Sequence, residues 1–190
     1  MTNITPLDYA LYVLYTMRDA PPDRVESALR QAGVDQSRLQ HSYSLVNKQN
    51  FTMKAAFADK SKILAPAIWE GVREIHGREC FMRSFRLPIW NDFLLDIYAT
   101  PEGRVWDERF TRASESSTTI VTRPEALEPW SVTMEEVDAQ FGPLRVEERW
   151  PPYESFSMEF SEDEGNISKY EVIFSWGLLQ KVDYEGTVLA

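Results

Sequence analysis

The spacing of apolar residues changes near Gly77, and this change constrains the fold more than any other feature of the sequence. Before Gly77, apolar residues recur at helical intervals, whereas after it they tend to alternate with polar residues, which is typical of strands. Helices that precede strands in this order favour an antiparallel α+β fold over a doubly wound one. We therefore predict N-terminal helices packed on a mainly antiparallel, meander-type β-sheet.

Two helices are expected at the N-terminus as an αα-hairpin. Thr5 can cap the first helix, Pro6 suits its first turn, and the helix should stop ahead of Pro22, where the second begins. The second helix should end at Gly33, because glycine readily adopts the conformation that ends helices. The stretch Tyr9–Met17 has no charged residue, which favours a central helix of the domain over the alternative of a helix covered by a partner.

The chain between residues 35 and 76 gives a less regular pattern. A helix or an irregular segment is expected around Phe51–Phe57. A further helix is expected from Leu64 to His76, since apolar residues fall there at helical spacing and Gly77 follows as a stop signal. The apolar positions of that helix are Leu64, Ile68, Val72 and Ile75.

After Gly77, the period of two predicts a strand over residues 79–87 and a hairpin over residues 92–112. The hairpin should turn at Thr100–Gly103, where Pro and Gly stand at positions that turns favour. Residues 116–122, SSTTIVT, form a further β-prone segment. A final meander is expected in the last part of the chain, with strands at 144–150, 153–161, 168–176 and 179–184.

A short helix is expected before the final meander, from about Ser131 to Phe141, with Thr133 and Glu136 at capping-box spacing. The sequence TMEEVDAQFGP, residues 133–143, followed by an antiparallel meander, resembles the small outer-membrane lipoprotein family that assists β-barrel assembly. The resemblance covers residues 131–184 at most. It implies a topology and no function, because the chain lacks the signal peptide and the lipidated cysteine of that family.

Residues 1–190 are expected to form a single compact α+β domain. The best position for a subdomain boundary lies within residues 113–131, but this stretch is not rich enough in Gly or Ser to form a free linker. A chain of this length can bury a core without the help of disulfides or metals.

The formal net charge of −10 narrows the classes of partner. The phosphates of nucleic acid would repel such a chain, so no nucleic-acid partner is expected. A basic protein partner fits, because opposite charges speed encounter; the alternative is that the acidity serves solubility alone. The single cysteine, with no secretory signal and no apolar run long enough to span a bilayer, predicts a cytoplasmic protein that does not insert into membranes.

No catalytic or cofactor motif is present. The sequence lacks G-x-S-x-G, the P-loop pattern and the glycine pattern of dinucleotide-binding folds. His76 and Cys80 stand close in the sequence, but a structural zinc site needs about four ligands with recognisable spacing. No catalytic residue, metal ligand or cofactor is therefore assigned, and a non-enzymatic role is favoured.

The leading hypothesis is a non-enzymatic acidic protein-binding protein. Its most concrete form is an inhibitor or immunity-type protein that neutralises a basic partner such as a toxin domain. Candidate anchors are aromatic residues late in the chain, and acidic residues near them complete the candidate surface. The anchors are Trp150, Tyr153 and Trp176, and the acidic residues are Glu147, Glu162, Asp163 and Glu164. Homo-oligomerisation is compatible with the same features.

The alternative hypothesis is a small-molecule-binding or enzymatic α+β domain with a pocket between the helices and the sheet. A deep pocket on which Arg83, Tyr98 or Glu79 converge would favour this alternative. A flat acidic face edged by aromatic residues would favour the protein-binding hypothesis.

We predict that the protein requires no metal ion. Because His76 and Cys80 supply two of the roughly four ligands of a structural zinc site, protein purified without added metal should lack stoichiometric zinc in elemental analysis. Stoichiometric zinc that disappears in a His76→Ala or Cys80→Ala variant would identify this pair as a metal site and contradict the prediction.

Overall fold

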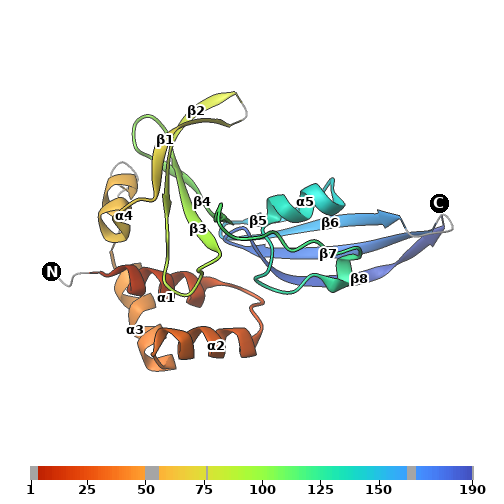
Figure 1. The fold of residues 1–190 in the computed structure, drawn as a ribbon, viewed down its shortest axis with the longest axis horizontal. Coiled ribbons are helices and arrows are strands. Elements are labelled where there is room, and N and C mark those ends of the chain that lie inside the picture. The colour runs from red at the N-terminus through yellow and green to blue at the C-terminus, as the bar shows by residue number, and fades with distance from the viewer. Residues whose placement is uncertain (1–3, 50–55, 76, 162–165, 190) are drawn as a thin grey trace. The chain divides into compact units, whose positions relative to one another are not determined.

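The computed structural model describes residues 4–49, 56–75, 77–161 and 166–189. These residues form five α-helices and two four-stranded antiparallel sheets (Figure 1). Four of the helices precede the first strand, so the predicted α+β class with N-terminal helices and antiparallel strands is confirmed. The meander order is also confirmed, in two sheets rather than in one, since neighbouring strands in each sheet follow one another in the chain.

The chain divides into two compact units. Unit 1 comprises Met1–Thr16 and Pro22–Glu115, and unit 2 comprises Met17–Pro21 and Ser116–Ala190. The division after Glu115 falls within residues 113–131, where the sequence places a subdomain boundary. That residues 1–190 form a single compact α+β domain stays a prediction.

Unit 1 begins with four helices, α1 (Pro6–Thr16), α2 (Pro22–Ala32), α3 (Gln36–Asn47) and α4 (Ala56–Leu64). The first two helices form at the predicted positions, but α1 packs against α3 and not against α2, so the predicted αα-hairpin is wrong. Gly33 follows α2 with a φ of 67°, and the N–H of Val34 donates to the carbonyl of Leu29, which is the predicted helix end. Of the segment expected at Phe51–Phe57, residues 51–55 lie outside the described residues, and the remainder begins α4.

The helix α3 is absent from the sequence prediction. Asp35 caps it, because its side chain accepts a hydrogen bond from the backbone N–H of Arg38. Its buried residues are Leu39, Ser42 and Val46. A serine in the middle of this buried stripe interrupts the apolar pattern, so helical periodicity alone does not detect α3.

The helix predicted from Leu64 to His76 is wrong. The helix α4 ends at Leu64, and Trp69–Ile75 form the strand β1, which pairs with β2 (Arg78–Phe85). Two of the apolar residues that suggested a helical stripe, Ile68 and Val72, are 57% and 54% exposed. The long-range pairing of β1 with β2 therefore outweighs the local helical spacing.

The sheet of unit 1 continues with β3 (Phe93–Ala99) and β4 (Val105–Arg112), in the order β1-β2-β3-β4. The predicted hairpin turn between β3 and β4 is confirmed. The N–H of Thr100 donates to the carbonyl of Arg104 and the N–H of Gly103 to the carbonyl of Thr100. Gly103 has a φ of 80°, which glycine adopts at little cost.

A buried polar cluster joins α1 and α4 to this sheet. The hydroxyl of Tyr9 in α1 donates to Oε1 of Glu108 in β4 at 3.1 Å, and Lys60 in α4 forms an ion pair with the other carboxylate oxygen. Burial, together with the charge of Glu108, raises the pKa of Tyr9. The guanidinium of Arg83 in β2 lies 4.8 Å from the ring centroid of Phe57 in α4. These contacts show helices packed on one face of the sheet.

Unit 2 contains a 3₁₀ turn, a helix and the second sheet. These are η1 (Pro124–Ala126), α5 (Met134–Phe141), β5 (Arg145–Trp150), β6 (Tyr153–Ser161), β7 (Asn166–Ser175) and β8 (Leu178–Leu189). The predicted short helix and final meander are confirmed, and Thr133 and Glu136 form the predicted capping box.

The strand expected at residues 116–122 is wrong. The N–H of Val121 donates to the side-chain oxygen of Gln140 in α5, and the side-chain nitrogen of Gln140 donates to the carbonyl of Thr119. This segment therefore bonds to a helix side chain instead of a neighbouring strand.

Alternate residues of the second sheet pack against α5 and η1 and form the core of unit 2. The buried core residues are Leu127, Val132, Val137, Phe141, Phe156, Met158, Tyr170, Val172, Phe174 and Leu179. Figure 1 shows α5 along one side of the sheet. Leu178 is also fully buried, so the apolar end of β7 and β8 is core, as predicted.

Asp8 connects α1 to α3 through a buried hydrogen-bond network. One carboxylate oxygen accepts hydrogen bonds from the hydroxyl of Thr5, at 2.6 Å, and from its N–H, at 3.1 Å. The other accepts from Arg38 at 2.6 Å and from Ser42 at 2.8 Å. Burial raises the pKa of Asp8, but the hydrogen bonds of Thr5 and Ser42 and the charge of Arg38 outweigh it, so the pKa lies below its ordinary value of 3.8.

We predict that Asp8→Asn lowers the free energy of unfolding by about 1–3 kcal/mol at pH 7, because charge-assisted hydrogen bonds in a buried site are lost. A carboxylate whose pKa is lowered by folding stabilises above its unfolded pKa and loses that contribution as pH falls through the folded value. Urea denaturation should therefore show the difference between the two proteins shrinking below about pH 4. A difference that is equal at pH 7 and pH 3 would contradict this assignment.

Candidate functional site

The net charge of the chain lies entirely in unit 2. Unit 2 has 16 Asp and Glu residues against 6 Lys and Arg residues, a formal charge of −10, whereas unit 1 has 14 of each. Solubility alone does not require the charge to be concentrated in one unit. The second sheet and its surroundings are therefore the part of the chain where an electrostatic function is expected.

One face of the second sheet carries mostly polar and aromatic side chains, although Ser155 and Ile173 on this face are buried. Residues on one strand alternate between the two faces, and paired residues on neighbouring strands share a face. Since Phe156 and Met158 point to the core, the residues between and beyond them point away from α5. We call this side the open face. It includes Arg145, Glu148, Trp150, Tyr153, Ser155, Ser157, Glu159, Lys169, Glu171, Ile173, Lys181 and Asp183.

The cations of unit 2 are already engaged. On the open face, Glu159 receives both Arg145 at 3.5 Å and Lys169 at 3.9 Å, and Lys181 pairs with Asp183 at 2.6 Å. The two remaining cations after residue 116 pair with carboxylates as well, namely Arg123 with Glu125 and Arg149 with Glu154. Each of these cations therefore has a carboxylate partner, and the remaining carboxylates of unit 2 give it its negative charge.

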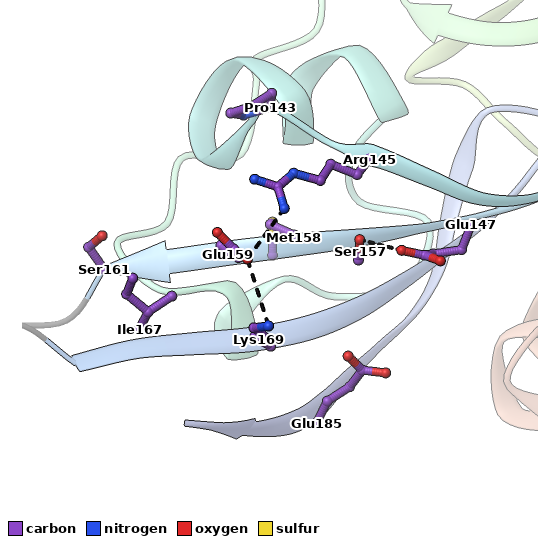
Figure 2. Close-up of a pocket in the computed structure, with 10 residues that line it drawn as sticks. All are labelled: Pro143, Arg145, Glu147, Ser157, Met158, Glu159, Ser161, Ile167, Lys169 and Glu185. Atoms are coloured by element: carbon purple, nitrogen blue, oxygen red, sulfur yellow. Dashed lines mark hydrogen bonds and ion pairs between the residues drawn. The ribbon is translucent and has the colours of Figure 1, made fainter. Parts of the chain in front are cut away.

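A shallow groove occupies part of the open face, with a volume of about 440 Å³. Its lining residues are Pro143, Arg145, Glu147, Ser157, Met158, Glu159, Ser161, Ile167, Lys169 and Glu185 (Figure 2). Glu147, a candidate from the sequence, accepts a hydrogen bond from the hydroxyl of Ser157 at 2.6 Å. The groove is lined by three carboxylates, Glu147, Glu159 and Glu185, and by two cations, Arg145 and Lys169, so it offers more negative than positive charge to a ligand.

The candidate anchors Trp150 and Tyr153 face each other as a cross-strand pair, so they share the open face. Trp150 is 68% exposed. Tyr153 is half-buried, and the guanidinium of Arg18 lies 5.6 Å from the centroid of its ring. The backbone N–H of Arg18 also donates to the hydroxyl of Ser175, at 3.3 Å, which holds the segment Met17–Pro21 in place.

Carboxylates gather around this aromatic pair. Burial raises the pKa of Tyr153, and the negative charges of Glu171, Asp19 and Glu148 raise it further. Neither Glu148 nor Glu171 forms an ion pair within the part of the chain that the structure describes. The aromatic end of the open face is therefore both acidic and accessible, through Trp150.

Trp176 is 5% exposed, so its interpretation as an exposed anchor is wrong. It lies in the turn between β7 and β8 with a φ of 54°, and its N–H donates to the carbonyl of Pro152 at 2.7 Å. This bond fixes the turn of Trp176 against the turn between β5 and β6, which the sequence does not reveal. The other acidic candidates, Glu162, Asp163 and Glu164, lie outside the described residues.

The residues that would support a catalytic pocket do not converge. Arg83 pairs with Ile97 and Tyr98 with Met82, so Arg83 and Tyr98 point to opposite faces of the first sheet. Glu79 lines a largely apolar cavity of about 630 Å³. Its other lining residues are Ile75, Cys80, Thr100, Pro101, Glu102 and Trp106. Burial raises the pKa of the Cys80 thiol, which disfavours the reactive thiolate.

Comparison with models of known protein families, with curated proteins and with solved structures finds no match to this chain. Among the described residues, no group of three or more His, Cys, Asp or Glu side chains is arranged to hold a metal ion. None of the helices in the described ranges combines the length and the apolar character needed to cross a lipid bilayer. The function must therefore be inferred from the geometry and charge of the open face.

We predict stability effects of very different size for two tryptophan truncations. Trp176→Ala should lower the free energy of unfolding by about 3–5 kcal/mol, because it empties a buried site. Trp150→Ala should change it by no more than about 0.5 kcal/mol, because its side chain is largely in solvent. Chemical denaturation of both variants is the measurement, and a large loss of stability in Trp150→Ala would show that this residue belongs to the core.

Proposed function

We propose that this chain is a non-enzymatic protein-binding protein that holds a basic protein partner on the open face of unit 2. Its most concrete form is an inhibitor or immunity-type protein that neutralises a basic toxin domain. A single cysteine, which leaves no disulfide within the chain, is consistent with a cytoplasmic location, which we include in the proposal.

The distribution of charge is the observation that carries this proposal. The formal charge of −10 belongs to unit 2, and the cations among residues 116–189 are all paired with carboxylates. A surface of this kind attracts a basic protein from a distance and raises its association rate. It repels nucleic acid by the same physics.

Charge complementarity alone speeds association but does little to prolong the lifetime of a complex. The aromatic end of the open face can extend that lifetime. Tryptophan is among the residue types most enriched at binding hot spots. Trp150 is 68% exposed, so a partner could bury most of its side chain. Glu148 stands two residues earlier on the same face of β5, so one partner can contact both.

The test uses two double variants with the same change in net charge. Glu148→Lys with Glu171→Lys reverses charges on the open face, and Glu26→Lys with Glu74→Lys reverses exposed charges of unit 1. The full-length proteins are immobilised, basic proteins retained from a lysate of the source cell are identified, and binding of each purified candidate is followed kinetically at several salt concentrations.

The open-face variant should lower the association rate constant about tenfold or more, and added salt should reproduce this loss with the unaltered protein. The unit 1 variant should bind nearly as fast as the unaltered protein. If both double variants lost the same fraction of the association rate constant, the effect would depend on overall net charge and not on the open face. This result would contradict the proposal. Failure of the unaltered protein to bind any basic protein in a salt-dependent manner would also contradict it.

A further inference from the structure

We propose that the aromatic end of the open face recognises an arginine side chain of the partner. The guanidinium would stack on the exposed indole of Trp150 and pair with the carboxylate of Glu148. This inference rests on the proposed function, since it names the chemical group by which a basic protein partner is held.

The protein already uses this arrangement once, with an arginine of its own. Arg18 places its guanidinium over the ring of Tyr153, 5.6 Å from the centroid. Burial raises the pKa of that tyrosine, and the carboxylates of Glu171 and Asp19 lie close enough to raise it further. An aromatic ring with carboxylates around it is therefore a surrounding that accommodates a guanidinium on this face.

Trp150 offers an aromatic ring of the same kind at a more exposed position. It is the cross-strand partner of Tyr153 and is 68% exposed. Within the described residues, no cation lies over its ring. Its neighbour Arg149 is paired with Glu154, and that pair points to the opposite face of the sheet. The position over the Trp150 ring is therefore assigned to a guanidinium of another molecule.

Glu148 supplies the charge for such a guanidinium. It shares the open face with Trp150 and forms no ion pair within the described residues. A cation that binds between the two groups would gain a ring contact and a carboxylate contact without displacing any ion pair of unit 2. Electrostatic complementarity therefore identifies the occupant as a cation of the partner protein.

The chemistry of the site favours arginine over lysine. A guanidinium is planar, stacks on aromatic rings, bonds a carboxylate through two N–H groups and is weakly hydrated. The lysine ammonium is a strongly hydrated point charge, and it loses more hydration when it moves onto an indole ring. Surface charge alone would attract arginine and lysine side chains equally. A higher affinity for arginine than for lysine would therefore indicate contact with the indole ring of Trp150.

The probes are capped tetra-arginine, tetra-lysine and tetra-citrulline peptides, titrated into the full-length, nitrogen-15-labelled protein. The indole N–H signal of Trp150, assigned with Trp150→Phe, is the local readout. Tetra-arginine should shift this signal and bind at least about threefold more tightly than tetra-lysine. Tetra-citrulline, which has nearly the same shape but no charge, should bind far more weakly.

Variants separate the ring from the carboxylate. Trp150→Leu should abolish the preference for arginine while leaving weak, salt-sensitive binding of both cationic peptides. Glu148→Gln should weaken the binding of tetra-arginine, whereas the control Glu74→Gln, an exposed position on β1 of unit 1, should leave it unchanged. Denaturation curves of these variants check that each one folds.

Equal affinity for the arginine and lysine peptides, with salt-sensitive binding to the open face, would overturn this inference and leave the proposed function standing. Binding of tetra-arginine that leaves the Trp150 signal unchanged would overturn it in the same way. Absence of binding by either cationic peptide at low salt would overturn both, because the open face would then attract no cation.

Discussion

The burial of alternate residues of β6 and β7 under α5 determines what the rest of unit 2 can do. The pair Met158 and Tyr170 lies in the core, and the neighbouring pair Ser157 and Glu171 lies on the open face. A shift of one residue in the register would exchange the two sets and bury charged groups. The free-energy cost of burying those charges therefore favours the observed register, in addition to the burial of the apolar residues in the core.

The two units use charge in different ways. In unit 1, the buried carboxylates are consumed by internal contacts, as Asp8 is by Arg38 and Glu108 is by Lys60. These pairs connect helices to one another or to the sheet. The 14 acidic and 14 basic residues of unit 1 give it no net formal charge. In unit 2, ion pairs use up the cations instead, so a surplus of one sign remains at the surface. A partner would therefore meet no net formal charge on unit 1 and a formal charge of −10 on unit 2.

The sequence predicts the elements that local signals determine and misses those that depend on distant pairing. The hairpin turn at Gly103 and the capping box of Thr133 follow from residues a few positions apart, and both are present. The sequence predicts a helix in place of the strand β1, because the pairing of β1 with β2 leaves no mark on the local spacing of the apolar residues of β1. The open face was only partly predictable. Alternation places Tyr153 on one face, but the contact with Arg18 joins segments that no local pattern relates.

The segment Met17–Pro21 also has a consequence for the order in which the protein folds. It is made early, between two helices of unit 1, yet it belongs to unit 2, where the N–H of Arg18 bonds to Ser175 across 157 positions of sequence. On a ribosome, α1 and α2 emerge long before β7 exists. Contacts of such wide separation close late, because the entropy of a long loop must be overcome first. Arg18 therefore reaches Tyr153 only after nearly the whole chain has been synthesised, and the aromatic end of the open face is among the last parts of the molecule to be completed.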